Sequence, residues 1–109
     1  MNDFGVFLID KPVGITSFDV IRKLRKTTNL RKMGHSGTLD PFADGLLPIL
    51  VGKATKIANL LLTDKKEYSV SARLGIKTDS GDITGKIVEE RPLPELSENR
   101  ILTAVKEML

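Results

Sequence analysis

The order of apolar and polar positions predicts a chain that alternates short strands with helices. Residues 5–9 are continuously apolar and precede a turn signal at residues 10–14, which is typical of a buried strand. Thr16 and Asp19 have the spacing of a capping box, so we expect a helix to begin at Thr16 or Ser17. Four apolar side chains at helical spacing give this helix one core-facing side: Phe18, Val20, Ile21 and Leu24.

Glycine and proline interrupt the periodicity in the middle of the chain. Residues 33–48 contain several of both and show no regular pattern, so we expect a long loop there. Loops of that length are mostly functional or disordered. The apolar run at residues 46–51 predicts a second buried strand, in which Pro48 indicates a sheet edge or a strand start. Residues 53–62 carry apolar side chains at helical spacing.

The last third of the chain predicts two strands and a helix. Residues 66–74 alternate between apolar and polar side chains, as a half-buried strand does. Glycine and aspartate at residues 79–85 precede a further predicted strand at residues 86–90. Ser97 is placed to open a final helix that reaches the last residue. Because neither glycine nor proline ends this helix, we expect the sequence to be part of a larger protein.

Composition narrows the possible functions. The 109 residues are 40% hydrophobic and 28% charged, which is an ordinary globular composition and predicts one hydrophobic core. The absence of cysteine excludes a disulfide framework, a thiol nucleophile and a zinc ribbon, and the single histidine excludes a histidine cluster for a metal. No signal peptide or membrane-spanning run is recognisable, so we expect a cytoplasmic protein.

Positive charge is concentrated around the predicted first helix. Residues 1–39 have a net charge of +4, whereas residues 40–109 have a net charge of −1. Six basic residues fall within eleven positions, in a stretch without acidic residues: Arg22, Lys23, Arg25, Lys26, Arg31 and Lys32. Such a cluster attracts polyanions, although a charge run taken alone is more often a solvated helix face.

Two kinds of phosphate-binding loop can be excluded. Gly52 and Lys53 are followed by Ala54, where a Walker loop requires serine or threonine, and the preceding glycine is at the wrong distance. The glycines of the predicted long loop do not have the G-x-G-x-x-G spacing of a dinucleotide-binding turn. The glycine-rich segment is therefore neither of these nucleotide-binding loops.

The remaining candidate for chemistry is Gly34-His35-Ser36-Gly37-Thr38-Leu39-Asp40-Pro41 and the residues after it. By spacing alone, Asp40 before Pro41 predicts a turn, and His35 is expected to be an exposed loop residue. The segment is nevertheless similar to the signature of the TruB family of tRNA pseudouridine synthases, G-H-[ST]-G-x-L-D-P-x-A-x-G-x-L-P. Three more segments resemble motifs of that family in the same order along the chain: residues 7–17, 66–70 and 74–82.

The resemblance implies an α+β fold with a mixed, mainly antiparallel sheet and packed helices. Residues 1–109 would be the amino-terminal part of the catalytic domain. The implied reaction converts the uridine in the T loop of tRNA to pseudouridine without a cofactor, a metal or an obligatory protein partner. The family's partner arginine and its RNA-binding tail belong to later motifs, so these residues alone are expected to be inactive.

The resemblance also assigns roles to individual residues. Asp40 would be the essential carboxylate, which attacks C1′ of the sugar, stabilises its positive charge or takes the 2′ proton in a glycal route. Tyr68 would stack on the uracil and accept the C5 proton, while its position on an alternating strand equally suits a core residue. His35 would brace the space left by the flipped nucleotide. The six basic residues would contact the RNA backbone.

Three alternatives remain open from the sequence. The first is a non-catalytic RNA-binding module that uses the basic helix, which Asp40 disfavours because an anionic loop weakens binding to RNA. The second is a guide-RNA-dependent synthase of the dyskerin branch, in which Ser36 also occurs. Those relatives carry a longer segment before the first motif, which favours the stand-alone bacterial branch. The third is a structural fragment without a role of its own.

Overall fold

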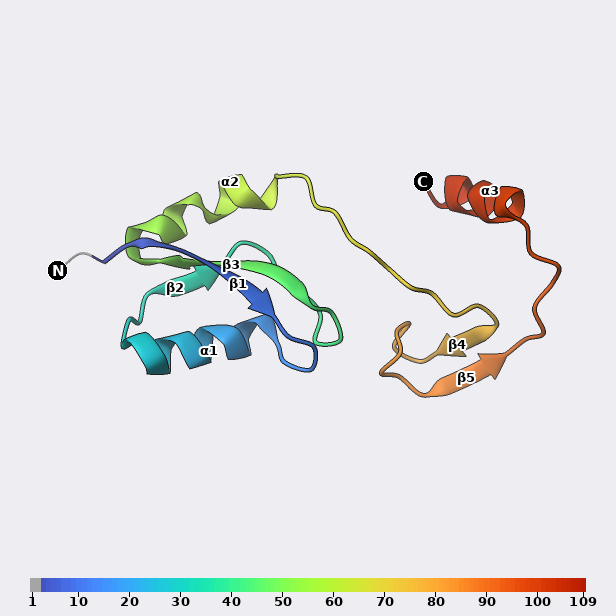
Figure 1. Cartoon of the computed structure of the whole chain (residues 1–109), viewed down its shortest axis with the longest axis horizontal. Coiled ribbons are helices and arrows are strands. Elements are labelled where there is room, and N and C mark those ends of the chain that lie inside the picture. Colours follow the sequence, from blue (N-terminus) through green and yellow to red (C-terminus); the bar gives the residue numbers. More distant parts are fainter. Residues whose placement is uncertain (1–2) are drawn as a thin grey trace. The chain divides into compact units, whose positions relative to one another are not determined.

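The computed structural model describes residues 3–109, which divide into two compact units (Figure 1). The amino-terminal unit ends at Glu67, and the carboxyl-terminal unit comprises Tyr68–Leu109. The first contains β1 (Gly5–Lys11), α1 (Ser17–Thr28), β2 (Met33–His35), β3 (Gly45–Val51), the 3-10 helix η1 (Gly52–Ile57) and α2 (Ala58–Leu62). The second contains β4 (Ile76–Thr78), β5 (Ile87–Glu90) and α3 (Glu98–Met108).

The predicted fold class is confirmed by the pairing of the strands. The amino-terminal unit has a three-stranded antiparallel sheet in the order β1-β3-β2. Helix α1 lies on one side of this sheet, and η1 and α2 lie on the other (Figure 1). In the carboxyl-terminal unit, β4 and β5 form a separate antiparallel pair. None of the helices among residues 3–109 has the length and apolar character needed to span a bilayer.

Helix α1 begins and ends where its local sequence requires. The Thr16 side chain accepts the Asp19 N–H, and the Asp19 carboxylate accepts the Thr16 N–H, which completes the predicted capping box. The helix ends at Thr28 and is followed by the capping residue Asn29, which has a left-handed backbone (φ 59°) and donates its N–H to the Arg25 carbonyl. Arg31 and Lys32 therefore lie beyond the helix, so the predicted basic helix carries four of the six basic residues.

One hydrophobic core forms between α1 and the strands of the first sheet, as the composition predicts. Among residues 3–109 the buried hydrophobic side chains all belong to the amino-terminal unit: Val20, Ile21, Met33, Leu47, Ile49, Leu50 and Val51. The prediction of a buried strand at residues 5–9 is right for the strand and wrong for its burial. Val6 and Leu8 alternate along β1 with Ile9, which packs against the core, so they lie on the opposite face of the sheet and are exposed.

The prediction that Pro48 marks a sheet edge or a strand start is wrong, because Pro48 lies in the middle of the central strand β3. Its carbonyl accepts the Ser36 N–H, so its nitrogen faces the β2 side as well. Strand β2 ends at His35, opposite Ile49, and Pro48 is thus placed just past the end of this ladder. The missing N–H therefore removes no strand-to-strand hydrogen bond.

The predicted loop at residues 33–48 is shorter than expected. Its first three residues form β2, and β3 already begins at Gly45, which leaves residues 36–44 as the connection. A three-residue strand containing glycine and histidine has no readable periodicity. It forms because β3 provides a neighbouring strand with which it pairs.

The carboxyl-terminal unit departs most from the prediction. The strand at residues 86–90 and the helix after Ser97 are confirmed as β5 and α3, whereas β4 was not predicted. The strand predicted at residues 66–74 is wrong, since this segment is extended but unpaired and Val70 is 80% exposed. An alternating segment becomes a half-buried strand only beside a second strand, and none of residues 3–109 pairs with it.

Candidate active site

Asp40 lies in the connection between β2 and β3, with its side chain exposed to solvent. Its carbonyl accepts the Ala43 N–H at 2.9 Å, which closes a turn with Pro41 in the second position. The prediction of a turn at Asp40 is thus confirmed. The same turn presents the carboxylate at the surface, where a substrate can reach it.

The residues on both sides of Asp40 are hydrogen-bonded to the turn that leads into α1. The buried Ser17 hydroxyl accepts the Leu39 N–H at 2.9 Å and donates to the Leu39 carbonyl at 3.3 Å. On the other side, the Gly14 N–H donates to the Pro41 carbonyl at 2.6 Å. The sequence indicated Ser17 only as a helix start, and no local pattern pointed to its contact with a residue 22 positions away.

Lys11 supports this turn from inside the protein. Its side chain is fully buried, and its Nζ donates to the carbonyls of Pro12 and Ile15, both at 2.8 Å. These hydrogen bonds offset the cost of burying the ammonium group. The two carbonyls lie on either side of Gly14, so Lys11 also holds the segment that carries the Gly14 N–H. Gly14 has a left-handed backbone, with φ +96°.

His35 is the last residue of β2 and is partly buried, so the expectation of an exposed loop residue is wrong. Pairing with Ile49 holds it on the sheet. Its Nδ1 is buried and has no hydrogen-bond partner within residues 3–109. Buried polar atoms are usually paired, so an unpaired nitrogen at this position is uncommon. His35 ends β2 directly before the connection that carries Asp40, so both residues belong to the amino-terminal unit.

Tyr68, the second residue predicted to contact the base, is the first residue of the carboxyl-terminal unit. Its side chain is 64% exposed, in the extended segment that precedes β4. The sequence pattern placed this ring on the inward face of a strand, and the structure places it in solvent instead. A ring with this exposure is accessible for stacking on a base.

The basic residues fall into two groups. Arg22 and Arg25 lie over the Phe18 ring, with their guanidinium carbons 4.8 and 5.9 Å from its centroid. Arg22 also pairs with Asp19 at 3.5 Å, an exposed contact of small energetic value. The exposed side chains of the others point to a solvated cationic surface: Lys23, Lys26, Arg31 and Lys32. Such a surface can bind phosphates without selecting a sequence.

Two aspartates outside the predicted site have perturbed acidity. The Thr16 backbone N–H and hydroxyl, followed by the Arg22 charge, hold the pKa of Asp19 below its ordinary value of 3.8. The Thr84 hydroxyl and N–H, together with the Ser80 hydroxyl, do the same for the pKa of Asp82. Asp19 is engaged in the cap of α1 and Asp82 in the turn between β4 and β5, so both carboxylates have a structural role.

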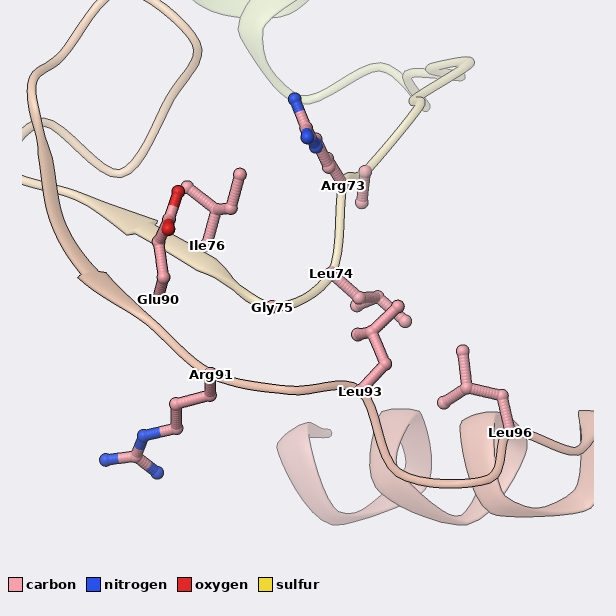
Figure 2. Close-up of a pocket in the computed structure, with 9 residues that line it drawn as sticks. Arg73, Leu74, Gly75, Ile76, Glu90, Arg91, Leu93 and Leu96 are labelled. Atoms are coloured by element: carbon pink, nitrogen blue, oxygen red, sulfur yellow. The ribbon is translucent and has the colours of Figure 1, made fainter.

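The carboxyl-terminal unit has a surface hollow of about 590 Å³ between the segments 72–76 and 90–96 (Figure 2). Leu74, Leu93 and Leu96 gather on one side of it, while the side chain of Arg91 points away from them. None of the predicted site residues lines the hollow. In the part of the chain that the structure describes, no three His, Cys, Asp or Glu side chains are arranged to hold a metal ion.

Comparison with known proteins adds independent information. Residues 25–109 match the model of the TruB family pseudouridylate synthases, amino-terminal domain. The tRNA pseudouridine synthase B of Coxiella burnetii is 46% identical over 97 residues, which cover 89% of this chain and 31% of that protein. The Citrobacter koseri protein of the same name is 51% identical over 89 residues, covering 82% and 28%. The chain thus spans about a third of the length of the curated relatives it matches.

A solved structure shares the fold of part of the chain. It is an H/ACA RNP bound to a substrate RNA that contains 2′-deoxyuridine. One of its chains matches with a TM-score of 0.52 and 49% sequence identity, over 54% of this chain and 19% of that one.

Proposed function

Since the chain belongs to the TruB family of pseudouridylate synthases, we propose that it forms the amino-terminal part of a catalytic domain that converts uridine in tRNA to pseudouridine. The observation that carries the proposal is Asp40, an exposed carboxylate within the family's signature. The residues before and after it are hydrogen-bonded to the turn that leads into α1. The substrate we propose is the uridine of the T loop. A protein acting on tRNA would work in the cytoplasm.

The proposed reaction is an isomerisation at one nucleotide. The N-glycosidic bond breaks, the uracil turns while it stays bound, and its C5 forms a new bond to C1′ of the ribose. Asp40 would attack C1′, stabilise the positive charge that develops there, or take the 2′ proton. Each role requires an ionised carboxylate that can approach the sugar, and the exposure of Asp40 supports this.

Two other residues would handle the flipped base. Tyr68, accessible in its extended segment, would stack on the uracil and accept the C5 proton in the last step. His35, partly buried at the end of β2, would brace the space that the nucleotide leaves. Filling this space lowers the cost of extruding a base, which is about a few kcal/mol.

The basic residues would contribute affinity for the RNA backbone. Lys23 and Lys26 on α1, and Arg31 and Lys32 after it, are exposed and able to reach phosphates. Matches to bacterial tRNA pseudouridine synthases B over 82–89% of the chain support a stand-alone enzyme. The likeness to an H/ACA RNP chain favours a guide-RNA-dependent enzyme as the second candidate. Turnover of tRNA transcripts without added guide RNA separates these two functions.

Replacing Asp40 tests the proposal in the complete enzyme that contains these residues. Asp40→Asn keeps the shape of the side chain but can neither attack nor take a proton, so turnover should be abolished while tRNA binding is retained. Asp44→Asn changes the same charge in the same connection and serves as the control with near-normal turnover. Asp40→Asn turnover within about tenfold of wild type, which is about 1.4 kcal/mol, would refute the assignment.

A further inference from the structure

Ser17 is the first residue of α1, yet its hydroxyl bonds to the active-site connection and not to its own helix. The side chain is only 2% exposed. A buried hydroxyl costs free energy unless it is hydrogen-bonded. The Ser17 hydroxyl is stabilised in its buried position by hydrogen bonds to Thr38 and Leu39.

These contacts use the full bonding capacity of the hydroxyl. Serine has one O–H to donate and two lone pairs that accept. Ser17 Oγ donates to the Leu39 carbonyl at 3.3 Å, accepts the Leu39 N–H at 2.9 Å and accepts the Thr38 hydroxyl at 3.3 Å. One side chain thus orients the peptide groups before and after Leu39.

The second of those peptide groups joins Leu39 to Asp40. On the other side of Asp40, the Pro41 carbonyl is held by the Gly14 N–H at 2.6 Å. Asp40 therefore lies between two fixed points, and both come from the turn at residues 14–17. Its exposed carboxylate is positioned by the backbone on either side of it.

Helix capping does not explain Ser17. The preceding Thr16 already caps α1 together with Asp19. The Ser17 hydroxyl is therefore not needed to begin the helix. Its three bonds to residues 38 and 39 are the function that remains for it.

We propose that Ser17 is a positioning residue for Asp40, acting through the backbone of Leu39. This inference rests on the proposed function for its catalytic consequence, because Asp40 must first be the essential carboxylate. Misplacing a reacting group by about an ångström lowers rates roughly 100-fold. Loss of the Ser17 hydroxyl should thus lower kcat while leaving tRNA affinity nearly unchanged, since Ser17 is buried and not itself exposed to RNA.

The test compares Ser17→Ala with Ser17→Thr and Thr16→Ala in the complete enzyme. Ser17→Ala removes all three bonds and should lower kcat roughly 10- to 100-fold with KM unchanged. Ser17→Thr restores a hydroxyl and should recover most of kcat. Thr16→Ala is the matched control, because it weakens the cap of the same helix without touching Leu39. Hydrogen–deuterium exchange of residues 36–44 should accelerate in Ser17→Ala only.

Each outcome decides the proposal. A folded Ser17→Ala enzyme with wild-type kcat overturns it, as does an equal loss of kcat in Thr16→Ala. If Ser17→Ala does not fold, Ser17→Cys replaces it, since a thiol keeps the size and bonds weakly; the same loss of kcat is expected and wild-type kcat overturns the proposal. If Ser17→Ala accelerates exchange around Asp40 but the wild-type protein lacks synthase activity, the proposed function is refuted. The role of Ser17 in holding the backbone beside Asp40 would still stand.

Discussion

The two units of this protein are stabilised in different ways. The amino-terminal unit buries a hydrophobic core between α1 and the central strand β3. In the carboxyl-terminal unit, which the structure describes throughout, no hydrophobic side chain is buried, and Ile83 is 86% exposed. Apolar residues occur in both units, so composition does not cause the difference. Burial requires elements that pack against each other, and only the first unit brings helices onto a sheet of three strands.

Local polar contacts hold the carboxyl-terminal hairpin instead. The Asp82 carboxylate accepts hydrogen bonds from Ser80 and Thr84, and the Asp79 carboxylate accepts the Lys86 N–H. These partners are at most seven residues apart, so they form without distant contacts. A hairpin of two short strands is marginal by itself in water. We therefore expect substitutions of apolar residues to lower stability mainly in the first unit. Substitutions of the predicted site residues should affect function in both units.

The largest expected effect concerns function in the unit that lacks a core. Tyr68→Phe keeps the stacking surface and removes the hydroxyl, so RNA binding should persist while product formation falls by roughly 10²- to 10⁴-fold. Tyr68→Leu should weaken both. Turnover of the Phe variant under saturating tRNA, with binding measured separately, checks this. Equal turnover of wild type and Tyr68→Phe would leave the hydroxyl without a catalytic role.

A pair of isoleucines tests the difference in stability directly. Ile49→Ala removes a fully buried side chain and should lower the free energy of unfolding by about 2–5 kcal/mol. Ile83→Ala makes the same chemical change at an exposed position and should stay within about 0.5 kcal/mol. Urea denaturation monitored by circular dichroism gives both values. Similar losses in the two variants would contradict the assignment of the core to one unit.

Basic residues of the two units should differ in their effect on RNA binding. Replacing Arg25 and Lys26 by Ala should weaken binding to all RNAs similarly and flatten its salt dependence, by about one unit of slope for each lost phosphate contact. Lys77 and Arg91 of the carboxyl-terminal unit, replaced together, are the control of equal charge. Titrations at several salt concentrations measure the slopes. An unchanged slope in the α1 variant would make its basic face a solvated surface only.

The smallest effect is a dependence of stability on pH that both units share. The pKa of Asp19 is lowered in the folded protein, so its contribution is present above the ordinary value of 3.8 and is lost as the pH falls through the lower folded value. Asp82 behaves in the same direction. Asp19→Asn should reduce the fall in the free energy of unfolding of the first unit at acidic pH, and Asp82→Asn should leave that fall unchanged. Hydrogen exchange of each unit at decreasing pH distinguishes them.

Some features of this protein could be predicted from its sequence because they depend on neighbours in the chain. The start of α1 follows from the spacing of Thr16 and Asp19, and the turn at Asp40 follows from the proline after it. The family, likewise, is evident from its signature motif, which is a local string of residues. These features need no knowledge of the remaining fold.

Other features were decided only by tertiary structure, because they depend on residues far apart in the sequence. Strand β2 exists through its pairing with β3, and Pro48 is tolerated in the central strand because β2 ends beside it. Residues 66–74 have a strand pattern but lack a partner strand among residues 3–109. Ser17 has no local signal beyond a helix start, and its bonds to Leu39 arise when the first turn packs on the connection that carries Asp40. Local spacing determined which residues are suited to the chemistry, and long-range packing determined what holds them in place.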